Sequence, residues 1–213
     1  MKSSSITRLW IASGNAAKTK ELVDFSARFF PEYNELVPRE PNGVIENEPT
    51  FEGNARLKAH ALAGELIAEG HDDFSVLADD SGLCVDILGG RPGIFSGRYS
   101  SSGKNSKGNL EKVLEELGAI TMNIQQRTGS YHCALILIRV ANGQVVEEFE
   151  SRGERQGLIG LTPKGANGYA YDPVFLDPQT LRSYGEISYE EKQLDSHRQR
   201  AFENMKLNAE KTL

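Results

Sequence analysis

The chain has 213 residues, of which 38% are hydrophobic and 25% charged, which is the composition of one globular domain, residues 1–213, with a real core. A formal net charge of −6 argues against nucleic-acid binding, which depends on neutralising phosphates, while a local basic pocket for a small phosphorylated ligand stays compatible with it. No stretch approaches the roughly 20 apolar residues that span a bilayer, so no membrane association is expected.

The start of the chain and its two cysteines predict a cytoplasmic protein. Residues 1–5 lead only into the apolar run 9–12, which is too short for the core of a signal peptide. Cys84 and Cys133 both lie in apolar runs and are interpreted as buried thiols. Buried thiols without a disulfide framework suit a reducing cytosol.

Strand and helix signals alternate along the chain. Strands are expected at residues 8–12, 33–37, 74–78, 83–88, 130–140 and 144–155, and helices at residues 19–30, 51–69, 109–117 and from about 190 to the C-terminus. Pro31 and Gly70 end the first two helices, residues 89–93 predict a sharp turn, and Asn142-Gly143 is the turn of a hairpin. Because this hairpin interrupts the alternation, the pattern predicts an α/β fold with a mixed, strongly twisted sheet.

A pair of adjacent carboxylates, in the run Asp79-Asp80-Ser81-Gly82, follows the apolar residues 74–78. Two neighbouring carboxylates at the end of a buried strand cost desolvation and mutual repulsion unless a cation or a proton relieves them. Packing needs no such pair, so it indicates metal-assisted chemistry. Taken alone, an ordinary turn closed by Ser-Gly explains the same residues.

The first strand runs into a glycine-containing turn at residues 13–18 that opens a helix. Such a turn presents backbone N–H groups to an anion, and Lys18 adds a positive charge for a phosphate. Ala12 and Ala17 stand where a P-loop needs glycine, so an ordinary P-loop NTPase is not expected. A simple helix start with a solvated lysine is the alternative.

Three carboxylates surround the start of the long predicted helix: Glu46, Glu48 and Glu52. Most carboxylates there complement the helix dipole. One of them could instead complete a metal site with Asp80, because Mg²⁺ typically binds one or two carboxylates together with substrate phosphates. Asn54 and Lys58 are four residues apart and share a helix face, so both could point to this site, or Lys58 could be solvated.

The C-terminal third offers groups for a planar ring. Residues 168–173 are rich in aromatic residues and glycine and end in Asp-Pro. The aromatic side chains would suit stacking on the ring, and the Asp carboxylate would accept from ring N–H groups. Taken alone, this segment favours a structural loop. Lys192, His197 and Arg198 supply donors, but on a helix such residues are usually surface decoration. The chain has no cluster of His and Cys at metal-ligand spacing and no G-x-S-x-G elbow, so zinc and serine hydrolases are not expected.

Taken in order, these motifs resemble one family, the inosine/xanthosine triphosphate pyrophosphatases, which are house-cleaning nucleotide hydrolases. The resemblance spans residues 8–205, and seven motifs in the right order make it specific. The matching residues are Ser13-Gly14-Asn15 with Lys18, Thr50-Phe51 with Asn54-Ala55 and Lys58-Ala59, Ala78-Asp79-Asp80-Ser81-Gly82-Leu83, Gly89-Gly90 with Pro92-Gly93-Ile94, Ser96 with Arg98-Tyr99-Ser100, Gly168-Tyr169 with Tyr171-Asp172-Pro173, and Glu191-Lys192 ahead of Ser196-His197-Arg198. Residues 79–83 look like the bacterial branch.

The resemblance implies hydrolysis of a nucleoside triphosphate to the monophosphate and pyrophosphate. The implied substrates are the deaminated purines ITP, dITP and XTP, which the enzyme would remove from the nucleotide pool. The implied cofactor is Mg²⁺ and the implied assembly is a homodimer. The implied fold has two lobes around a long, strongly twisted mixed sheet, with a nucleotide cleft between them.

Carried over by position, Asp80 is the implied catalytic carboxylate, which acts as base toward water and contacts the metal, and Glu46 is the second metal-side carboxylate. The implied substrate-binding residues are Ser13, Gly14, Asn15, Lys18, Lys58, Ser81, Arg98, Tyr169, Ala170, Tyr171, Asp172, Lys192, His197 and Arg198. Lys, His and Arg donors suit a purine with a carbonyl at position 6, whereas adenine would leave them unpaired at a cost of roughly 1–3 kcal/mol per buried group.

The chain departs from the family pattern in two places. The usual Phe-Gly-Tyr-Asp is Tyr169-Ala170-Tyr171-Asp172 here, which puts the fit of the base in question. The common Glu before Asn54 is Gly53, and the usual Thr-Gly after the metal-side Glu is Asn47-Glu48, so Glu48 stays an alternative to Glu46. Two other functions stay open: a pyrophosphatase for other modified nucleotides, and a nucleotide-binding sensor without turnover.

Overall fold

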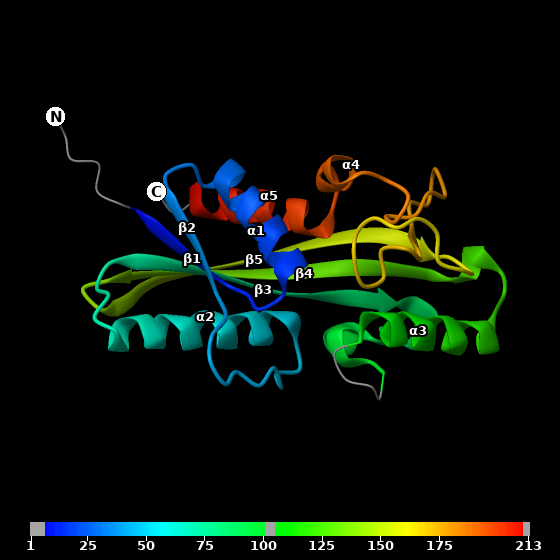
Figure 1. Ribbon diagram of the computed structural model, residues 1–213, viewed down its shortest axis with the longest axis horizontal. Coiled ribbons are helices and arrows are strands. Elements are labelled where there is room, and N and C mark those ends of the chain that lie inside the picture. The colour runs from blue at the N-terminus through cyan, green and yellow to red at the C-terminus, as the bar shows by residue number, and fades with distance from the viewer. Residues whose placement is uncertain (1–6, 101–104, 211–213) are drawn as a thin grey trace. The chain divides into compact units, whose positions relative to one another are not determined.

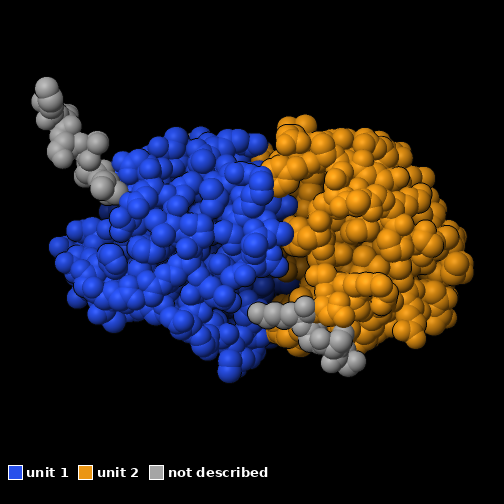
Figure 2. All heavy atoms as spheres, in the orientation of Figure 1, with its two compact units in different colours: residues 1–80, 134–153, 200–213 blue, residues 81–133, 154–199 orange. Residues whose placement is uncertain are grey.

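The structure of the chain is a computed structural model that describes residues 7–100 and 105–210. The first five residues, considered above for a signal peptide, lie outside the described ranges. The chain divides into two compact units (Figure 2). Unit 1 contains residues 1–80, 134–153 and 200–213, and unit 2 contains residues 81–133 and 154–199.

Six strands form one mixed sheet in the order β2-β1-β3-β4-β5-β6. The strands are β1 (Arg8–Ala12), β2 (Glu35–Arg39), β3 (Phe74–Val85), β4 (Thr128–Ala141), β5 (Gln144–Ile159) and β6 (Phe175–Leu176). Strand β1 pairs in parallel with both β2 and β3, whereas β5 and β6 are antiparallel. The predicted α/β class with a strongly twisted mixed sheet is therefore confirmed, while the nucleotide cleft stays a prediction.

The described ranges also contain five α-helices and three short 3₁₀ helices, of which α4 and α5 follow the last strand. They are α1 (Ala16–Phe29), α2 (Phe51–Ala68), α3 (Ser106–Ile120), α4 (Tyr189–Gln193) and α5 (His197–Glu210), with η1 (Asp86–Leu88), η2 (Gly93–Arg98) and η3 (Ile124–Gln126). Among the helices that the structure describes, none combines the length and the apolar character needed to cross a membrane.

Two of the expected strands are wrong as separate elements. Residues 74–78 and 83–85 belong to the single strand β3, residues 86–88 form the 3₁₀ helix η1, and the two carboxylates lie inside the strand instead of at its end. Pairing with β1 ends at Ala78, but β4 is the other neighbour of β3 in the sheet, so tertiary pairing outweighs the turn preference of Asp, Ser and Gly. The hairpin is confirmed: Asn142 and Gly143 have φ values of 52° and 70°, as its two-residue turn requires.

The first helix also begins earlier than the sequence predicts, at Ala16 instead of Thr19. The side chain of Asn15 caps it by accepting hydrogen bonds from the backbone N–H groups of Ala17 and Lys18. A capped start saturates N–H groups that would otherwise be left without partners, so the helix can begin directly after the strand.

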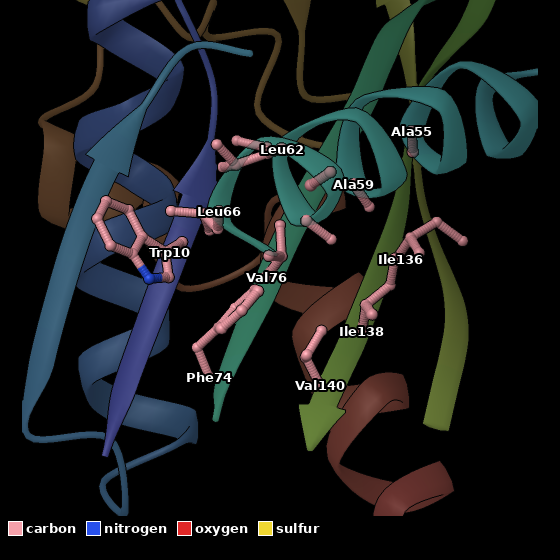
Figure 3. Close-up of a cluster of buried hydrophobic side chains, with 13 residues drawn as sticks. Trp10, Ala55, Ala59, Leu62, Leu66, Phe74, Val76, Ile136, Ile138 and Val140 are labelled. Carbon is pink, nitrogen blue, oxygen red and sulfur yellow. The ribbon is translucent and has the colours of Figure 1, made fainter. Parts of the chain in front are cut away.

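The core of unit 1 follows from the alternation of side chains along its strands. Trp10, Val76 and Ile136 face α2 and pack with its small residues Ala55 and Ala59 (Figure 3). The alternate side chains are buried on the other face of the sheet, where Figure 1 places α1 and α5. Alternate residues of the unit 1 part of β3 therefore face opposite layers: Val76 packs with α2, whereas Asp79 pairs with Lys18 of α1.

Unit 2 builds a second core, in which aromatic residues are prominent. Leu83 of β3 packs with Val113 of α3, and the rings of Tyr131 and Phe175 lie with their centroids 4.4 Å apart. Cys84 and Cys133 are free thiols, and Cys133 is buried as expected whereas Cys84 is half-buried. This core supports the aromatic loop that precedes β6.

Ala170 has a backbone φ of +53°. This left-handed conformation costs an L-residue with a Cβ about 1–2 kcal/mol, whereas glycine adopts it freely but loses about 0.5–1 kcal/mol of unfolded-state entropy. We therefore expect Ala170→Gly to raise the free energy of unfolding by up to about 1 kcal/mol, measured by urea denaturation. The control is Ala61→Gly inside α2, which should lower it by about 1 kcal/mol. A destabilised Ala170→Gly would mean that the packing of its methyl group on the unit 2 core decides the balance.

Candidate functional site

Asp79 and Asp80 lie inside β3 and are 1% and 6% exposed. Consecutive side chains of a strand point to opposite faces, so the two carboxylates meet different helices. Oδ2 of Asp79 lies 3.5 Å from Nζ of Lys18, which α1 carries. Oδ1 of Asp80 lies 3.6 Å from Nζ of Lys58, which α2 carries. The pair therefore does not form one shared site; each carboxylate has a lysine of its own.

Lys58 is the cation at the centre of this cluster. Its Nζ donates a hydrogen bond of 2.6 Å to Oε1 of Glu46, and its side chain is 12% exposed, so it is not the solvated lysine of the alternative interpretation. Burial acts to lower the pKa of Lys58, but the carboxylates of Asp80, Asp79 and Glu46 outweigh burial and raise that pKa above its ordinary value. The ammonium therefore stays charged between two carboxylates.

The carboxylate of Asp80 is held in an environment that favours its protonated form. Burial raises the pKa of Asp80, and the nearby charges of Glu46 and Asp79 add to this, although Lys58 and Lys18 oppose it. A buried carboxylate with a raised pKa is a better proton acceptor at neutral pH than an exposed one. It also gains from any cation that binds beside it.

The residues of this cluster fit Mg²⁺. The carboxylates of Glu46 and Asp80 converge on one cationic group, the Lys58 ammonium. Within residues 7–100 and 105–210, no group of three or more His, Cys, Asp or Glu side chains is arranged to hold a metal ion alone. Two carboxylates without further protein ligands suit Mg²⁺, which completes its shell with water and substrate phosphates. The contact with Lys58 favours Glu46 over Glu48 as the second carboxylate.

In the turn between β1 and α1, two of the backbone N–H groups that could bind an anion are already hydrogen-bonded. Oδ1 of Asn15 accepts hydrogen bonds of 3.1 Å from the N–H groups of both Ala17 and Lys18, so these two donors are already paired. The carboxylate of the exposed Glu40 lies over Gly14, where a Cβ would collide with it unless the Glu40 side chain moved away. A surface hollow of about 450 Å³ adjoins the turn; its lining consists of Ser13, Gly14, Ala16, Thr19, Lys20, Pro38, Arg39 and Glu40. Lys18 does not line it.

In unit 2, Asp172 is bonded on both of its carboxylate oxygens. Oδ2 accepts from Nζ of Lys192 at 2.8 Å and from the backbone N–H of Tyr169 at 2.9 Å, and Oδ1 accepts from the hydroxyl of Tyr131 at 3.1 Å. Asp172 and Lys192 are 2% and 4% exposed. Burial and the neighbouring Asp172 raise the pKa of Tyr131 well above its ordinary value, so its hydroxyl keeps its proton and donates.

The other predicted base-binding residues gather around this buried pair. The ring of His197 stacks on Tyr131 with centroids 4.8 Å apart, and Nη2 of Arg198 donates to the hydroxyl of Ser81 at 2.6 Å. The Tyr169 ring lies 4.9 Å from Nζ of Lys192 and 6.0 Å from Cζ of Arg198, both within the range of cation–π attraction. These residues form a rigid, cationic and aromatic group.

Three predicted residues have other surroundings. The hydroxyl of Tyr171 donates to the carbonyl of Ser96 at 2.8 Å, and this tyrosine is 2% exposed, so it belongs to the core. Arg98 is exposed and lies over the ring of Phe95 at 5.3 Å. Ala170 holds the left-handed turn between the two tyrosines.

The structure adds two residues that were not among the predicted site residues. Tyr131 bonds Asp172 and supports His197, yet in the sequence it is one aromatic residue in an apolar strand. Asn54 bonds Asp80; the sequence indicated it through its spacing from Lys58 and through the motif of Thr50-Phe51 with Asn54-Ala55, but gave it no role. In both cases the role follows from a contact between distant segments, which no local pattern contains.

Comparison with known proteins gives a consistent result. A family model described as the Ham1 family matches residues 9–208. The chain is 38% identical to a dITP/XTP pyrophosphatase of Lactococcus lactis subsp. lactis over 92% of this chain and 93% of the relative. It is 39% identical to a dITP/XTP pyrophosphatase of Geobacillus kaustophilus over 90% of this chain and 88% of the relative.

Solved structures agree with this match. The structure of the Staphylococcus aureus Ham1 protein superposes with a TM-score of 0.77 at 32% identity and covers 97% of this chain and 100% of that one. A HAM1 protein from Coxiella burnetii gives a TM-score of 0.77 at 29% identity over 96% of this chain and 99% of that one. The match of the family model over nearly the whole chain and these identities show that the chain belongs to the Ham1 family.

Proposed function

We propose that this chain hydrolyses deaminated purine nucleoside triphosphates, namely dITP, XTP and ITP, to the nucleoside monophosphate and pyrophosphate. The observation that carries the proposal is the buried cluster of Asp80, Lys58 and Glu46, in which a carboxylate with a raised pKa lies beside a charged ammonium and a second carboxylate. The names of the relatives, dITP/XTP pyrophosphatase, support the choice of substrate. Without those names, the cluster alone would support only hydrolysis of a phosphate ester or anhydride.

In this proposal, Asp80 takes the proton from the attacking water and Glu46 and Asp80 hold Mg²⁺, which supplies charge neutralisation at the phosphates. The water attacks the α-phosphorus, the bond to the bridging oxygen breaks, and pyrophosphate leaves. Such a reaction needs mainly positioning and charge neutralisation. The ammonium groups of Lys18 and Lys58, which pair with Asp79 and Glu46 in the structure, would also bind the phosphate oxygens.

The group in unit 2 would recognise the base. Tyr169 offers a ring face, and Lys192, His197 and Arg198 offer donors to a carbonyl at position 6 of a purine. Because Asp172 and Ser81 fix Lys192 and Arg198 by hydrogen bonds of 2.8 Å and 2.6 Å, these donors are preorganised. An amino group at that position would leave them unpaired, which disfavours adenine.

The cellular context completes the proposal. We place the enzyme in the cytoplasm, where the nucleoside triphosphate pool is, and we propose that it works as a homodimer, as the family resemblance implies. The hydrolase reading is favoured over a sensor without turnover by the buried carboxylates, since a binding protein gains nothing from the cost of burying them.

The first test is pyrophosphate release from dITP, XTP, ITP, GTP and ATP, with and without Mg²⁺. We expect Mg²⁺-dependent release from the first three and weak release from GTP and ATP. Asp80→Asn keeps the shape of the side chain but removes the proton acceptor, so kcat/KM should fall by about 10²- to 10⁴-fold. Asp24→Asn is the matched control, because Asp24 lies on the surface of the same unit and pairs with the exposed Lys20 at 2.8 Å.

Three outcomes of that test would change the proposal. Release of orthophosphate in place of pyrophosphate would overturn the reaction type. Turnover only of methylated or pyrimidine triphosphates would move the substrate class to other modified nucleotides. Tight nucleotide binding with no turnover of any nucleotide in the wild type would favour the sensor.

Base selectivity is tested with Lys192→Met, which removes one donor and leaves a chain of similar length. The ratio of kcat/KM for dITP to that for dATP should fall on the order of tenfold, because one buried group no longer discriminates. Lys112→Met is the matched control: Lys112 also lies over a tyrosine ring in unit 2, that of Tyr99 at 4.3 Å, but outside the base-binding group. An unchanged ratio in a folded Lys192→Met protein would remove Lys192 from base recognition.

The raised pKa of Asp80 predicts a cost to stability. A carboxyl group whose pKa is higher in the folded state than in the unfolded state stabilises the fold when protonated and loses this contribution as pH rises through the folded pKa. Asp80→Asn should therefore unfold at a temperature no lower than wild type at pH 8 in EDTA. The difference in unfolding temperature between Asp80→Asn and wild type should shrink as pH falls below the folded pKa of Asp80. A variant that is less stable at pH 8 would mean that the ion pair with Lys58 outweighs burial.

A further inference from the structure

Asn54 lies in the first turn of α2 and is fully buried, with 0% of its surface exposed. Its amide group bonds two segments that are distant in sequence. Oδ1 accepts a hydrogen bond of 3.0 Å from the backbone N–H of Glu48, and Nδ2 donates one of 3.2 Å to Oδ2 of Asp80. A single side chain therefore connects the acidic loop before α2 with the carboxylate in β3.

These two bonds allow only one orientation of the amide. If it were reversed, its oxygen would face the carboxylate of Asp80 and its NH₂ group would face the N–H of Glu48, so acceptor would meet acceptor and donor would meet donor. The two oxygens of the Asp80 carboxylate therefore have different partners: Oδ2 faces Asn54, while Oδ1 lies 3.6 Å from Nζ of Lys58. The plane of the Asp80 carboxylate is thereby fixed from two sides.

The acidic loop packs directly on the first turn of α2. A Cβ at Gly53 would lie 2.7 Å from Cβ of Glu48, closer than real Cβ atoms approach, so the loop can take this path only past a glycine. Thr50 caps the helix by accepting from the N–H of Gly53 at 3.0 Å. Two residues before Glu48, the loop carries Glu46, which reaches Lys58 at 2.6 Å. The position of the loop therefore sets the position of Glu46.

We propose that Asn54 is a positioning residue that sets the separation of the carboxylates of Glu46 and Asp80 for a divalent cation. It touches one carboxylate directly and holds the loop of the other through the N–H of Glu48. Partners that orient metal-binding carboxylates typically change metal affinity or activity by about 10- to 100-fold when they are removed. The identity of the cation as Mg²⁺ rests on the proposed function; the arrangement of the two carboxylates does not.

A purely structural role predicts something different. A buried asparagine that only stabilises the start of α2 would lower stability when replaced and leave cation affinity and turnover per folded molecule unchanged. A positioning residue changes cation affinity even where stability is kept. Cation binding by the nucleotide-free protein therefore separates the two roles, and it does so without any reference to catalysis.

The experiment measures Mn²⁺ binding to the nucleotide-free protein by the loss of the electron paramagnetic resonance signal of free Mn²⁺. We expect Asn54→Ala to raise the Kd for Mn²⁺ by about 10- to 100-fold. The control is Ser151→Ala, which removes another buried hydrogen bond of unit 1, the 2.8 Å bond from the Ser151 hydroxyl to the carbonyl of Ala201. This control should unfold at a lower temperature and bind Mn²⁺ like wild type.

Gly53→Ala is a second variant that does not touch Asp80 and is compatible with folding. Alanine favours the helix over glycine, but its methyl group must displace the backbone of the acidic loop at Glu48. We expect weaker Mn²⁺ binding and, because the displaced loop strains the bond from the N–H of Glu48 to Asn54, an unfolding temperature that falls no further than that of Ser151→Ala. In both variants, kcat at saturating nucleotide should fall while KM for nucleotide at saturating Mg²⁺ stays within about twofold, since the lysines remain in place.

Each outcome is decisive. If Asn54→Ala and Gly53→Ala bind Mn²⁺ like wild type, Asn54 is structural and the inference fails, whatever the activity. A wild type that binds no Mn²⁺ also overturns the inference, because then there is no site for Asn54 to arrange. If wild type binds Mn²⁺ but releases no pyrophosphate from dITP or XTP, the proposed function fails while the comparison of variants still tests Asn54.

Discussion

The alternation of side chains along β3 is the constraint on which the candidate site depends. Asp79 and Asp80 are neighbours in the chain, yet the pleat turns one toward α1 and the other toward α2. Each carboxylate then has its own lysine at 3.5 or 3.6 Å, and the repulsion expected of an adjacent acidic pair is reduced. The two residues can therefore have different tasks: Asp79 is a partner that fixes Lys18, whereas Asp80 is bonded by Asn54 and faces Lys58. One strand can thus present two neighbouring carboxylates to two different helices, which is what the proposed division of roles between Asp79 and Asp80 requires.

Both units stabilise a buried acid with a lysine from a helix, but the remaining partners differ. In unit 2, hydrogen bonds from Tyr131, Tyr169 and Lys192 occupy both oxygens of Asp172, so that this carboxylate is an anchor. In unit 1, burial still raises the pKa of Asp80 despite its lysines, so its negative charge is only partly compensated. Incomplete compensation costs stability and leaves capacity for a cation or a proton. The contrast supports a reactive role for Asp80 and a positioning role for Asp172, which holds Lys192 and the Tyr169 loop.

The sequence predicts the helices and the hairpin, because these depend on local patterns: helical spacing and the Asn142-Gly143 turn. The motifs in a fixed order also predict the family, which the comparisons confirm. It does not predict that residues 79–82 lie inside a strand, since the place of β3 between β1 and β4 in the sheet overrides their turn preference. Nor does it distinguish Tyr171, whose hydroxyl bonds the carbonyl of Ser96 in the core, from Tyr169, which lies beside Lys192. Both differences concern partners from distant segments. The motifs predict which residues to examine, while the direction in which each side chain points depends on contacts that no local pattern contains.

The departures from the family pattern near α2 are explained by one contact. The common Glu before Asn54 is Gly53 here, and the usual glycine two residues after the metal-side Glu is Glu48. A Cβ at position 53 would approach Cβ of Glu48 to 2.7 Å, so a side chain at both positions would force the loop away from the helix. Exchanging which of the two positions carries glycine keeps the loop on its path, and with it the bond from the N–H of Glu48 to Asn54. The chain thus changes both residues of a contact and retains the backbone geometry that the contact serves. The two departures are therefore a single compensated change. They give no reason to assign the role of second metal-side carboxylate to Glu48 in place of Glu46.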